Sequence, residues 1–420
     1  MTAVAERSGY LGTNISQVIA HAGVSRPTFY DYFTDKDDCF LAALQEIQQR
    51  LLDQVSKAVL AEAPENALEA ALRAIVKFAQ TEPTAARLLI DEILICGIRA
   101  LDARDRGITE LEDIIERAHN EVDPATPTPD FPVRMLVGGT YRLLAARLRH
   151  KEPLTGLASD LLSWVKSYRQ PTDEHRWRAL QPTPPPAPSP LVPKTKLDAP
   201  RPLPRGRPRI GPEQVSTNHR QRILFAAADI AAEKGQAAAT IAEITKLAGL
   251  DSRAFYRLFS DRQEVFAAVQ EIHFEHVMAV STKAFFTTKS WPERLWEAGR
   301  AFSETIEQNP NLAHISFIEF YAAGPIAVKR HNDLLLAFSI FLQEGYRYKP
   351  PEIPPSPLAL EAIATTNFEM IYHQIRNRLA PQLSSLLAHA THLDLAPFLG
   401  PAAANEFIDS MLTKHCAHNN

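Results

Sequence analysis

The side chains best suited to binding chemistry lie on a short segment around residue 255. In GLDSRAFYRLF, residues 249–259, Phe255 and Phe259 are four residues apart and predict one apolar helix face. The opposite face carries Ser252, Arg253, Tyr256 and Arg257. Because guanidinium and phenol groups hydrogen-bond to phosphates and base edges, this face indicates contact with nucleic acid. For one such segment alone, a plain core role of the aromatic pair remains the alternative.

The flanking residues predict the elements that position this segment. Residues 241–248 form a helix with one apolar face, and Gly249 ends it because glycine tolerates a left-handed backbone. A second helix is predicted from about residue 251 to 259, and Ser260 with Gln263 predicts a capping box that opens the next one. Two helices joined by a tight glycine turn are typical of a helix-turn-helix, whose second helix enters the DNA major groove.

A second copy of this element lies 226 residues earlier in the chain. GVSRPTFYDYF, residues 23–33, aligns with residues 249–259 without insertion or deletion. The matched positions are Ile15, Val18, Ala22, Gly23, Phe29, Tyr30, Phe33 and Phe40 with Ile241, Ile244, Ala248, Gly249, Phe255, Tyr256, Phe259 and Phe266. Residues 82–97 also resemble residues 309–324, at an offset of 227. The two blocks predict two tandem copies of one two-part protein.

Length and periodicity predict an all-α protein of several domains. The 420 residues exceed the ~250 to 300 that one hydrophobic core supports. Apolar residues recur with a helical period, as in residues 68–80 and 334–345, and no convincing strand is found. Proline supplies 12 of the 32 residues in 181–212, which predicts an extended linker. The predicted domains are a first head at 1–44, a first helical body at 45–170, a linker at 171–216, a second head at 217–269 and a second helical body at 270–420.

Other functional classes are disfavoured by the motifs that the sequence lacks. It contains no GxSxG, no HExxH and no phosphate-binding glycine loop, and VGGT at 137–140 is interpreted as an interrupted helix. Cys39, Cys96 and Cys416 lie far apart, which argues against a disulfide framework or a zinc site. No apolar run approaches the ~18 residues of a membrane span. We therefore expect no enzymatic activity, no cofactor, no metal and no membrane insertion, and a cytoplasmic location.

Both blocks resemble the TetR/AcrR-type transcriptional regulators. The family's AGVS…FYxxFxxKxxL block is similar to AGVSRPTFYDYFTDKDDCF, residues 22–40, and more loosely to AGLDSRAFYRLFSDRQEVF, residues 248–266. The resemblance implies two tandem units, each with a three-helix DNA-binding head on a helical body for ligand binding and dimerisation. It implies base-facing positions for Arg26, Thr28, Arg253 and Ala254, and phosphate contacts for Tyr30, Tyr256, Lys36, Arg262, Asn14 and Thr240.

The first head departs from the family pattern in its first helix. Residues 220–235 supply a bracing helix to the second head, and Gly235 aligns with Gly9. Projecting Arg220 back by 226 residues falls before Met1. The first head is therefore expected to be N-terminally incomplete, either because the start codon is misplaced or because this head is crippled.

Charge also distinguishes the two heads. Residues 1–40 hold three basic and five acidic side chains, a balance of −2, whereas residues 201–269 hold eleven and seven, a balance of +4. Because phosphate neutralisation dominates DNA affinity, the second head is expected to be the principal DNA contact. Just before it, PRGRPR resembles an AT-hook core, in which arginines enter a narrow minor groove. These arginines are Arg205, Arg207 and Arg209, and a solubilising basic arm is the alternative.

The two bodies carry apolar helical stripes that predict a pocket for a small, apolar effector. Weak candidates for ligand contact in the second body are His314, Glu319, Tyr321, Tyr372 and His373, together with Trp291 and Trp296. Those in the first body are Asp91, Glu92 and Tyr141. For each of them a core or surface role is the alternative.

The sequence thus predicts a ligand-responsive regulator that binds double-stranded DNA, interpreted as a repressor. Its two heads are presented either by an internal pseudo-dimer of the fused halves or by a homodimer that uses only the second heads. Successive major grooves lie about 34 to 36 Å apart, and a pair of heads must span them. A ligand-binding or protein-interaction module of TetR ancestry that has lost DNA binding is the alternative from a different class, and an enzyme is a distant third.

Overall fold

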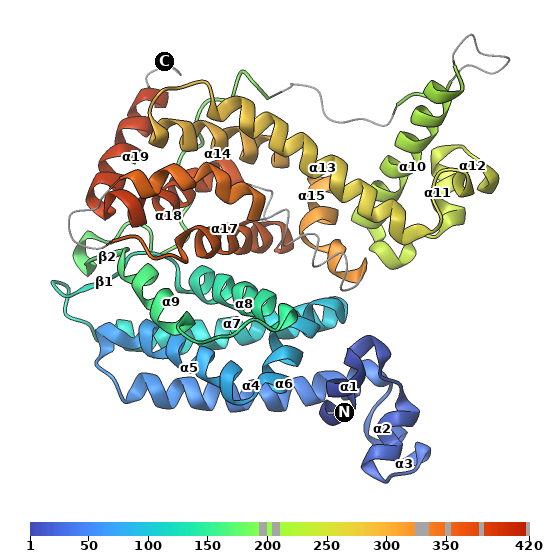
Figure 1. Cartoon of the computed structure of the whole chain (residues 1–420), viewed down its shortest axis with the longest axis horizontal. Helices are drawn as coiled ribbons and strands as arrows, with labels where there is room; N and C mark the ends of the chain where they lie inside the picture. Colours follow the sequence, from blue (N-terminus) through green and yellow to red (C-terminus); the bar gives the residue numbers. More distant parts are fainter. Residues whose placement is uncertain (193–199, 204–210, 324–335, 349–353, 378–381, 417–420) are drawn as a thin grey trace. The chain divides into compact units, whose positions relative to one another are not determined.

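The computed structural model describes residues 1–192, 200–203, 211–323, 336–348, 354–377 and 382–416 (Figure 1). Most of this part of the chain is helical, which confirms the predicted all-α class. It also contains one two-stranded antiparallel ladder, in which β1 (Pro127–Pro129) pairs with β2 (Arg169–Pro171). The sequence did not indicate these strands, because three-residue segments rich in proline carry no alternating pattern. Among the helices described, none has the length and apolarity needed to cross a membrane.

The first repeat forms a head and a body. The helices of the head are α1 (Thr2–Gly12), α2 (Ile15–Ala22) and α3 (Arg26–Tyr32), followed by α4 (Lys36–Leu60), which leads into the body. The body continues with η1 (Pro64–Asn66), α5 (Ala67–Thr81), α6 (Pro83–Ala86), η2 (Arg87–Asp91), η3 (Glu92–Ile95), α7 (Ile98–His119), α8 (Val133–His150), α9 (Leu157–Lys166) and η4 (Thr172–Glu174).

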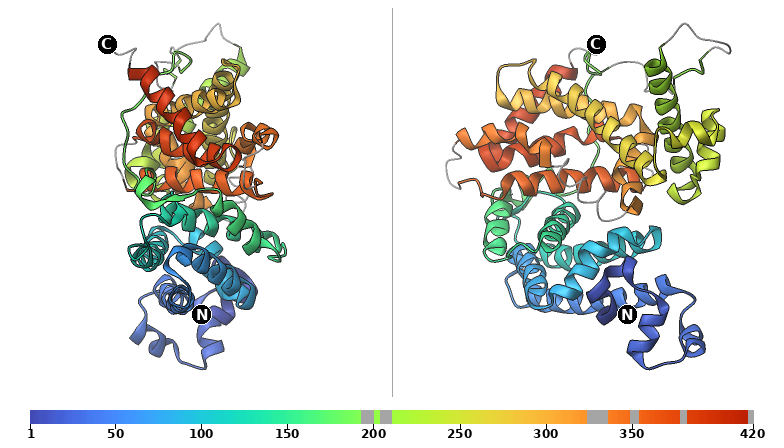
Figure 2. Two further views of the ribbon diagram at one scale, coloured as in Figure 1. Left: turned by 90° about the vertical axis from the view of Figure 1, so that its left-hand side faces the viewer. Right: turned by 45° about the vertical axis from the view of Figure 1, so that its right-hand side comes forward.

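The second repeat begins with the same kind of head. Its helices are α10 (Pro212–Lys234), η5 (Gln236–Ala238), α11 (Ile241–Ala248) and α12 (Ser252–Tyr256), followed by α13 (Arg262–Phe285). The remaining elements are α14 (Trp291–Gln308), α15 (Pro310–Phe317), η6 (Glu319–Ala323), η7 (Phe338–Phe341), η8 (Gln343–Arg347), α17 (Ala359–Arg376), η9 (Leu383–Leu386), α18 (Leu387–Leu399) and α19 (Pro401–Cys416). In the views of Figures 1 and 2, α11 and α12 lie at the N-terminal end of α13.

The chain divides into two compact units that do not coincide with the two repeats. One unit contains residues 1–180 together with 343–369 and 392–405, and the other contains 181–342, 370–391 and 406–420. The first unit therefore includes the first half of α17 and most of α18, which the sequence assigns to the second repeat.

Inside the first unit, α8 packs against α17 at equivalent positions of the two repeats. Arg142 and Glu369 are 227 residues apart, which is the offset between the repeated bodies, and their side chains form an ion pair. Gly139 and Thr366 share this offset, and a Cβ placed on Gly139 would lie only 3.0 Å from the Thr366 Cα. Equivalent residues meet in this way only at a twofold axis. We call this crossing of α8 and α17 the pseudo-dyad.

The two glycines of VGGT serve this crossing. The predicted interruption of the helix is wrong, because α8 runs unbroken from Val133 to His150 through both glycines. A Cβ on Gly138 would overlap the side chain of Glu369, and one on Gly139 would overlap Thr366. Glycine is therefore needed here for close approach of two helices and not for a break in one.

A buried ion cluster joins the helices at the pseudo-dyad. Arg104, on α7, donates through Nη1 and Nη2 to Glu369, at 3.1 and 2.9 Å, and Arg142 Nε donates to Glu369 Oε2 at 2.6 Å. The side chains of Arg104, Arg142 and Glu369 are 1%, 8% and 1% exposed. Burial raises the pKa of Glu369, but the two guanidinium groups outweigh it and lower the pKa to about 2.

The segment after α9 is held in the first unit by Asp130. This buried carboxylate accepts hydrogen bonds from the backbone amides of Arg176 and Trp177 at 3.0 and 2.8 Å, and from the side chain of Gln170. The Trp177 indole then donates to Asn405 at 2.7 Å and stacks on His392. Residues of α18 and α19 are thereby tied to the first repeat.

The proline-rich segment begins along the surface of the second unit and not as a separate spacer. Thr183 N donates to the Ser385 carbonyl at 2.8 Å, and Ser189 N donates to Glu304 at 2.7 Å. Val192 is buried against residues of α13 and α14. Of the predicted linker, residues 193–199 and 204–210 lie outside the described residues.

We expect Glu369 to make the stability of the first unit depend on pH at the acid end. Its pKa is about 2 in the folded chain and about 4.3 in an unfolded one, so its contribution is fully present above about pH 4.3. That contribution is lost as the pH falls through 2, and roughly two pKa units correspond to about 3 kcal/mol. Denaturant unfolding of wild type and Glu369→Gln should therefore show a gap at neutral pH that closes toward about pH 2. A gap that is the same at neutral and acid pH would contradict this assignment.

Candidate nucleic-acid interface

The helix-turn-helix of the second head is built by local capping. Thr240 and Glu243 form a capping box at the start of α11, and Gly249, with a φ of 63°, ends that helix. The Asp251 side chain accepts from the Ala254 amide at 2.7 Å and starts α12. The helix then ends at Tyr256, which is earlier than the predicted residue 259.

The next helix begins one residue later than the predicted capping box requires. Asp261 caps α13 by accepting from Glu264 N at 2.8 Å, whereas Ser260 lies outside the helix and its backbone amide donates to Glu264 at 2.6 Å. Aspartate competes with serine as a helix cap, so a pattern with both residues leaves the start ambiguous by one position.

The exposed face of α12 carries the residues that the sequence singled out. Ser252, Arg253 and Arg257 are exposed, and Tyr256 is 60% exposed while the adjacent Phe255 is fully buried. Within the described part of the chain, neither Arg253 nor Arg257 forms an ion pair. Two cationic side chains and a phenol are therefore available to phosphates and bases on one face.

Ala254 does not fulfil its predicted role as a base-facing residue. Its side chain is only 4% exposed, because it lies on the inner side of α12 with Phe255. A helix of five residues turns about half of its side chains toward the core, so carrying over a family position misassigned this one.

Arg222 supports this interface from behind. It lies on α10, is buried, and donates through Nη2 to the carbonyl of Ala248 and, at 3.3 Å, to that of Gly249. These carbonyls belong to the C-terminal end of α11, where a cation is favourably placed against the helix dipole. The bracing helix therefore holds the glycine turn directly, a contact that the sequence pattern did not reveal.

The first head has the same local design with different surface chemistry. Asn14 and Gln17 form the capping box of α2, Gly23 ends it with a φ of 68°, and Ser25 caps α3. Arg26 is exposed but its Nη2 donates to Ser16 Oγ at 3.1 Å, so the guanidinium lies along α2.

Other predicted residues of the first head differ in exposure. Tyr30 is 49% exposed, whereas Thr28 is half-buried. A Cβ on Gly23 would meet no atom within 4 Å, while one on Gly249 would lie 2.8 Å from Arg222 Nη2. The turn of the first head is thus not covered as that of the second is.

The two cations predicted to bind phosphate make the same backbone contact in each repeat. Lys36 Nζ donates to the Tyr10 carbonyl at 3.2 Å, and Arg262 Nη1 donates to the Gln236 carbonyl at 3.1 Å. Tyr10 and Gln236 each follow a glycine of positive φ, Gly9 at 66° and Gly235 at 81°. Both cations are half-buried, and in the free protein each holds the backbone of the residue that follows this glycine.

A carboxylate from each body completes this link. Glu92 Oε2 accepts from the Tyr10 amide at 2.5 Å, and Glu319 Oε2 accepts from the Gln236 amide at 3.1 Å. Glu92 also pairs with Arg87 at 2.7 Å. Burial raises the pKa of Glu319, and the hydrogen bond from Gln236 opposes that rise. We call the pair of contacts to the Tyr10 or Gln236 backbone the head–body link.

Glu319 and Glu92 were predicted as candidates for ligand contact in the bodies. In the structure their carboxylates accept hydrogen bonds from backbone amides of the heads. The signal that could have found this role was the alignment itself, since Glu92 and Glu319 are equivalent at the offset of 227. Of the other candidates, Tyr321 and Tyr372 are buried and His314 and His373 are half-buried. In the first body, Asp91 accepts from Arg149, and Tyr141 is buried.

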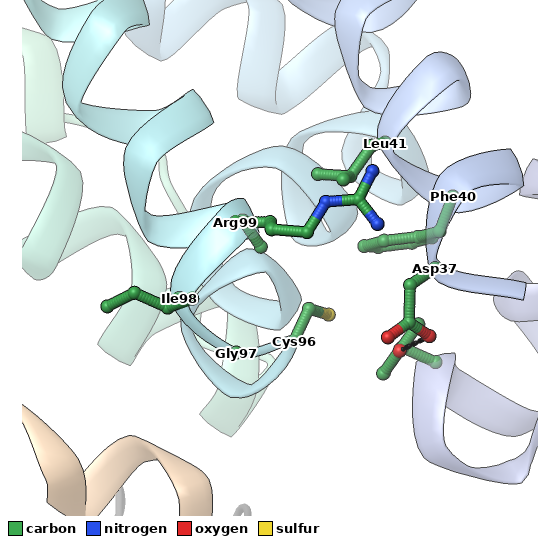
Figure 3. Close-up of a pocket in the computed structure, with 9 residues that line it drawn as sticks. Asp37, Phe40, Leu41, Cys96, Gly97, Ile98 and Arg99 are labelled. Atoms are coloured by element: carbon green, nitrogen blue, oxygen red, sulfur yellow. Dashed lines mark hydrogen bonds between the residues drawn. The ribbon is translucent and has the colours of Figure 1, made fainter. Parts of the chain in front are cut away.

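A cavity of about 170 Å³ lies beside the head–body link of the first repeat (Figure 3). It is lined by Tyr10, Asp37, Phe40, Leu41, Cys96, Gly97, Ile98, Arg99 and Ala100. The Tyr10 hydroxyl donates to Asp37, and Arg99 extends toward Leu41 (Figure 3). Burial raises the pKa of the Cys96 thiol well above its usual range, so this sulfur is not a reactive thiolate at neutral pH.

The basic segment with Arg205, Arg207 and Arg209 lies outside the described residues. Its resemblance to an AT-hook therefore remains a prediction from sequence.

Both heads match one known family. The family model for bacterial regulatory proteins of the tetR family matches residues 2–43 and 223–269. The HTH-type transcriptional activator FasR of Mycolicibacterium smegmatis is 29% identical over 122 residues, which are 29% of this chain and 56% of that protein. The chain thus spans about half the length of this curated relative.

Two solved structures of regulators each match less than half of this chain. The fatty acid degradation regulator FadR from Bacillus halodurans is 20% identical with a TM-score of 0.37, and the match covers 41% of this chain and 96% of that one. FadR from Bacillus subtilis, solved in complex with stearoyl-CoA, is 16% identical with a TM-score of 0.32, covering 45% of this chain and 96% of that one.

We expect Glu319→Ala to loosen the second head from its body without unfolding it. The Gln236 amide would lose its acceptor in a buried position, which costs about 1 to 3 kcal/mol. Hydrogen exchange should become faster at residues 235–240, while residues 9–14 of the first head stay protected. Glu92→Ala is the matched control and should show the reverse pattern. Equal exchange at residues 235–240 in wild type and Glu319→Ala would contradict the link.

Proposed function

Because the chain belongs to the tetR family of bacterial regulatory proteins and is a DNA-binding transcriptional regulator, we propose that its second head makes the principal contact with DNA. The observation that carries this proposal is the exposed face of α12. There Arg253, Tyr256 and Arg257 project on a helix whose turn is braced by Arg222. The family regulates transcription and does not catalyse reactions.

The contrast between the heads supports this choice. The first head carries an excess of acidic side chains, and Arg26 is engaged with Ser16. Phosphates repel acidic side chains and attract unpaired guanidinium groups, so most of the electrostatic free energy of binding arises at the second head. The first head then adds a weaker contact or orients the second.

The two heads are presented, in this proposal, by an internal pseudo-dimer. The crossing of α8 and α17 at equivalent positions supports it, because family members present paired heads through a twofold body interface. A homodimer through second heads alone would leave that crossing without a role in assembly.

We propose that a small apolar effector controls DNA binding, that the protein represses its target genes, and that it acts in the cytoplasm, where its DNA lies. The signal would pass from the body to the second head through Glu319, since its carboxylate joins η6 to the Gln236 backbone. Effector binding that moves η6 would shift the head and release the operator. The mycobacterial relative is named an activator, so whether this protein represses or activates has to be measured and is not inferred from that relative. A reporter gene behind the chain's own upstream region should be transcribed more when this protein is deleted, and less transcription would indicate an activator.

The principal test removes one arginine from each head. Arg253→Ala should weaken binding to DNA from the chain's own upstream region by about tenfold or more, because a bidentate base contact contributes about 1 to 3 kcal/mol. Arg26→Ala is the control in the second helix of the first head, one position from the residue that aligns with Arg253. It should change affinity less than about threefold, since a rim contact contributes only a few tenths of a kcal/mol. An electrophoretic shift assay with both variants measures the difference. Equal losses would show that the heads share the contact, and no binding by wild type would favour a module that has lost DNA binding.

The basic segment before the second head is tested through salt dependence. Replacing Arg205, Arg207 and Arg209 by alanine should reduce the slope of log affinity against log salt by roughly 2 to 3, because each neutralised phosphate contributes about 0.9. An AT-hook predicts a larger loss on AT-rich flanks than on GC-rich flanks of the same operator. An equal loss on both flanks indicates a solubilising or nonspecific basic arm, and an unchanged slope indicates that the segment does not contact DNA.

A further inference from the structure

The buried ion cluster at the pseudo-dyad has a chemical asymmetry that a homodimer could not have. We propose that Arg104, Arg142 and Glu369 select the partner of α8, admitting α17 and excluding a second α8, so that the working unit is a single chain. This inference rests on the proposed internal pseudo-dimer, although not on DNA binding. It identifies the residues that decide between the two assemblies left open by the sequence.

Arg142 and Glu369 lie at the pseudo-dyad, where like helices would bring like charges together. At a twofold axis each residue faces its own copy, so a pair of α8 helices would bring Arg142 against Arg142 and add two copies of Arg104. A pair of α17 helices would bring Glu369 against Glu369. All three side chains are at most 8% exposed, and water cannot screen such like charges. Only the mixed crossing of α8 with α17 pairs each charge with its opposite.

Neighbouring charges do not remove this asymmetry. Asp105 accepts from Arg104 Nη1 at 3.1 Å and is 21% exposed, so α7 and α8 together contribute two arginines and one aspartate. With Glu369 from α17 the cluster is electrically balanced. Without it, two copies of the first repeat would carry four arginines and two aspartates into the same crossing.

Shape points to the same partner. Gly138 leaves room for the Glu369 side chain, and Gly139 leaves room for Thr366. The equivalent positions on α17 are Thr365 and Thr366, which carry branched side chains. Two α17 helices would therefore place threonine where the mixed crossing has glycine, and two α8 helices would leave a gap there.

Because α8 and α17 are covalently connected, α8 pairs with α17 of the same chain and not with that of another chain. The cluster alone would accept α17 from another chain, but the two helices belong to one polypeptide. Their pairing is then an intramolecular step that does not depend on protein concentration, whereas pairing between chains does. Intramolecular pairing therefore prevails as long as the cluster excludes α8 with α8 and α17 with α17.

The test uses full-length chains and two opposite charge reversals. Wild type should sediment with the mass of one chain, 46.8 kDa, and should not exchange between fluorescently labelled samples. Arg142→Glu makes two α8 helices complementary, because the introduced carboxylate of each copy would meet Arg104 of the other, and it places two carboxylates at the intramolecular crossing. This variant should therefore shift to twice the mass and exchange labels.

Glu369→Arg is the matched control. It places arginine against arginine whether α8 pairs with α17, α8 with α8, or α17 with α17. It should remain at the mass of one chain and melt at a lower temperature than wild type. The double variant Arg142→Glu/Glu369→Arg restores an opposite pair and should regain the wild-type mass and most of the melting temperature. Rescue by the double variant supports the inference even where Arg142→Glu alone does not fold.

Three outcomes overturn the inference: a wild type that is a dimer with label exchange, an Arg142→Glu variant that folds and stays monomeric, or a double variant no better than the single ones. Operator binding measured on the same samples separates this inference from the proposed function. A monomeric wild type that ignores DNA would support the pairing rule and contradict DNA recognition, whereas a dimeric wild type that shifts DNA would do the reverse.

Discussion

The interaction on which the first unit depends is the burial of the Glu369 carboxylate between Arg104 and Arg142. Burying an unpaired carboxylate costs several kcal/mol, so this segment of α17 is stable there only with both guanidinium groups in place. The contact joins residues 227 positions apart and completes the body of the first repeat with helices from the second. The first unit thus contains segments of both repeats.

Duplication explains why the same physical solution occurs twice with different side chains. In both heads a glycine of positive φ interrupts or ends the first helix, Gly9 inside α1 and Gly235 after α10, and the buried amide and carbonyl of the next residue need partners. A body carboxylate satisfies the amide and a cation satisfies the carbonyl, with Lys36 in one repeat and Arg262 in the other. Because the need for a donor and an acceptor comes from the backbone after the glycine, the cation that meets it could differ between the repeats. Such a link ties each head to one segment of its body, η3 in the first repeat and η6 in the second.

Some expectations held because their causes are local. The left-handed Gly249 follows from residues a few positions apart, and it ends its helix as predicted. Ala254, Lys36 and Glu319 were assigned by resemblance or by residue type, and their surroundings depend on elements distant in the chain. Ala254 is buried by the packing of α12, and Lys36 and Glu319 each meet backbone atoms of another element. Predicting those contacts would have required knowing how the head meets its body.

By itself the sequence determined the helical class, the duplication, the helix-turn-helix in each half and the charged face around Arg253, because periodicity, glycine stops and caps act over short distances along the chain. Only the tertiary structure decided that VGGT is a point of close helix contact, that α17 completes the first body, and that Arg142 faces Glu369. The physical reason is that the structural role of a buried charge or a glycine depends on the atoms packed against it. Those atoms come from a segment more than 200 residues away.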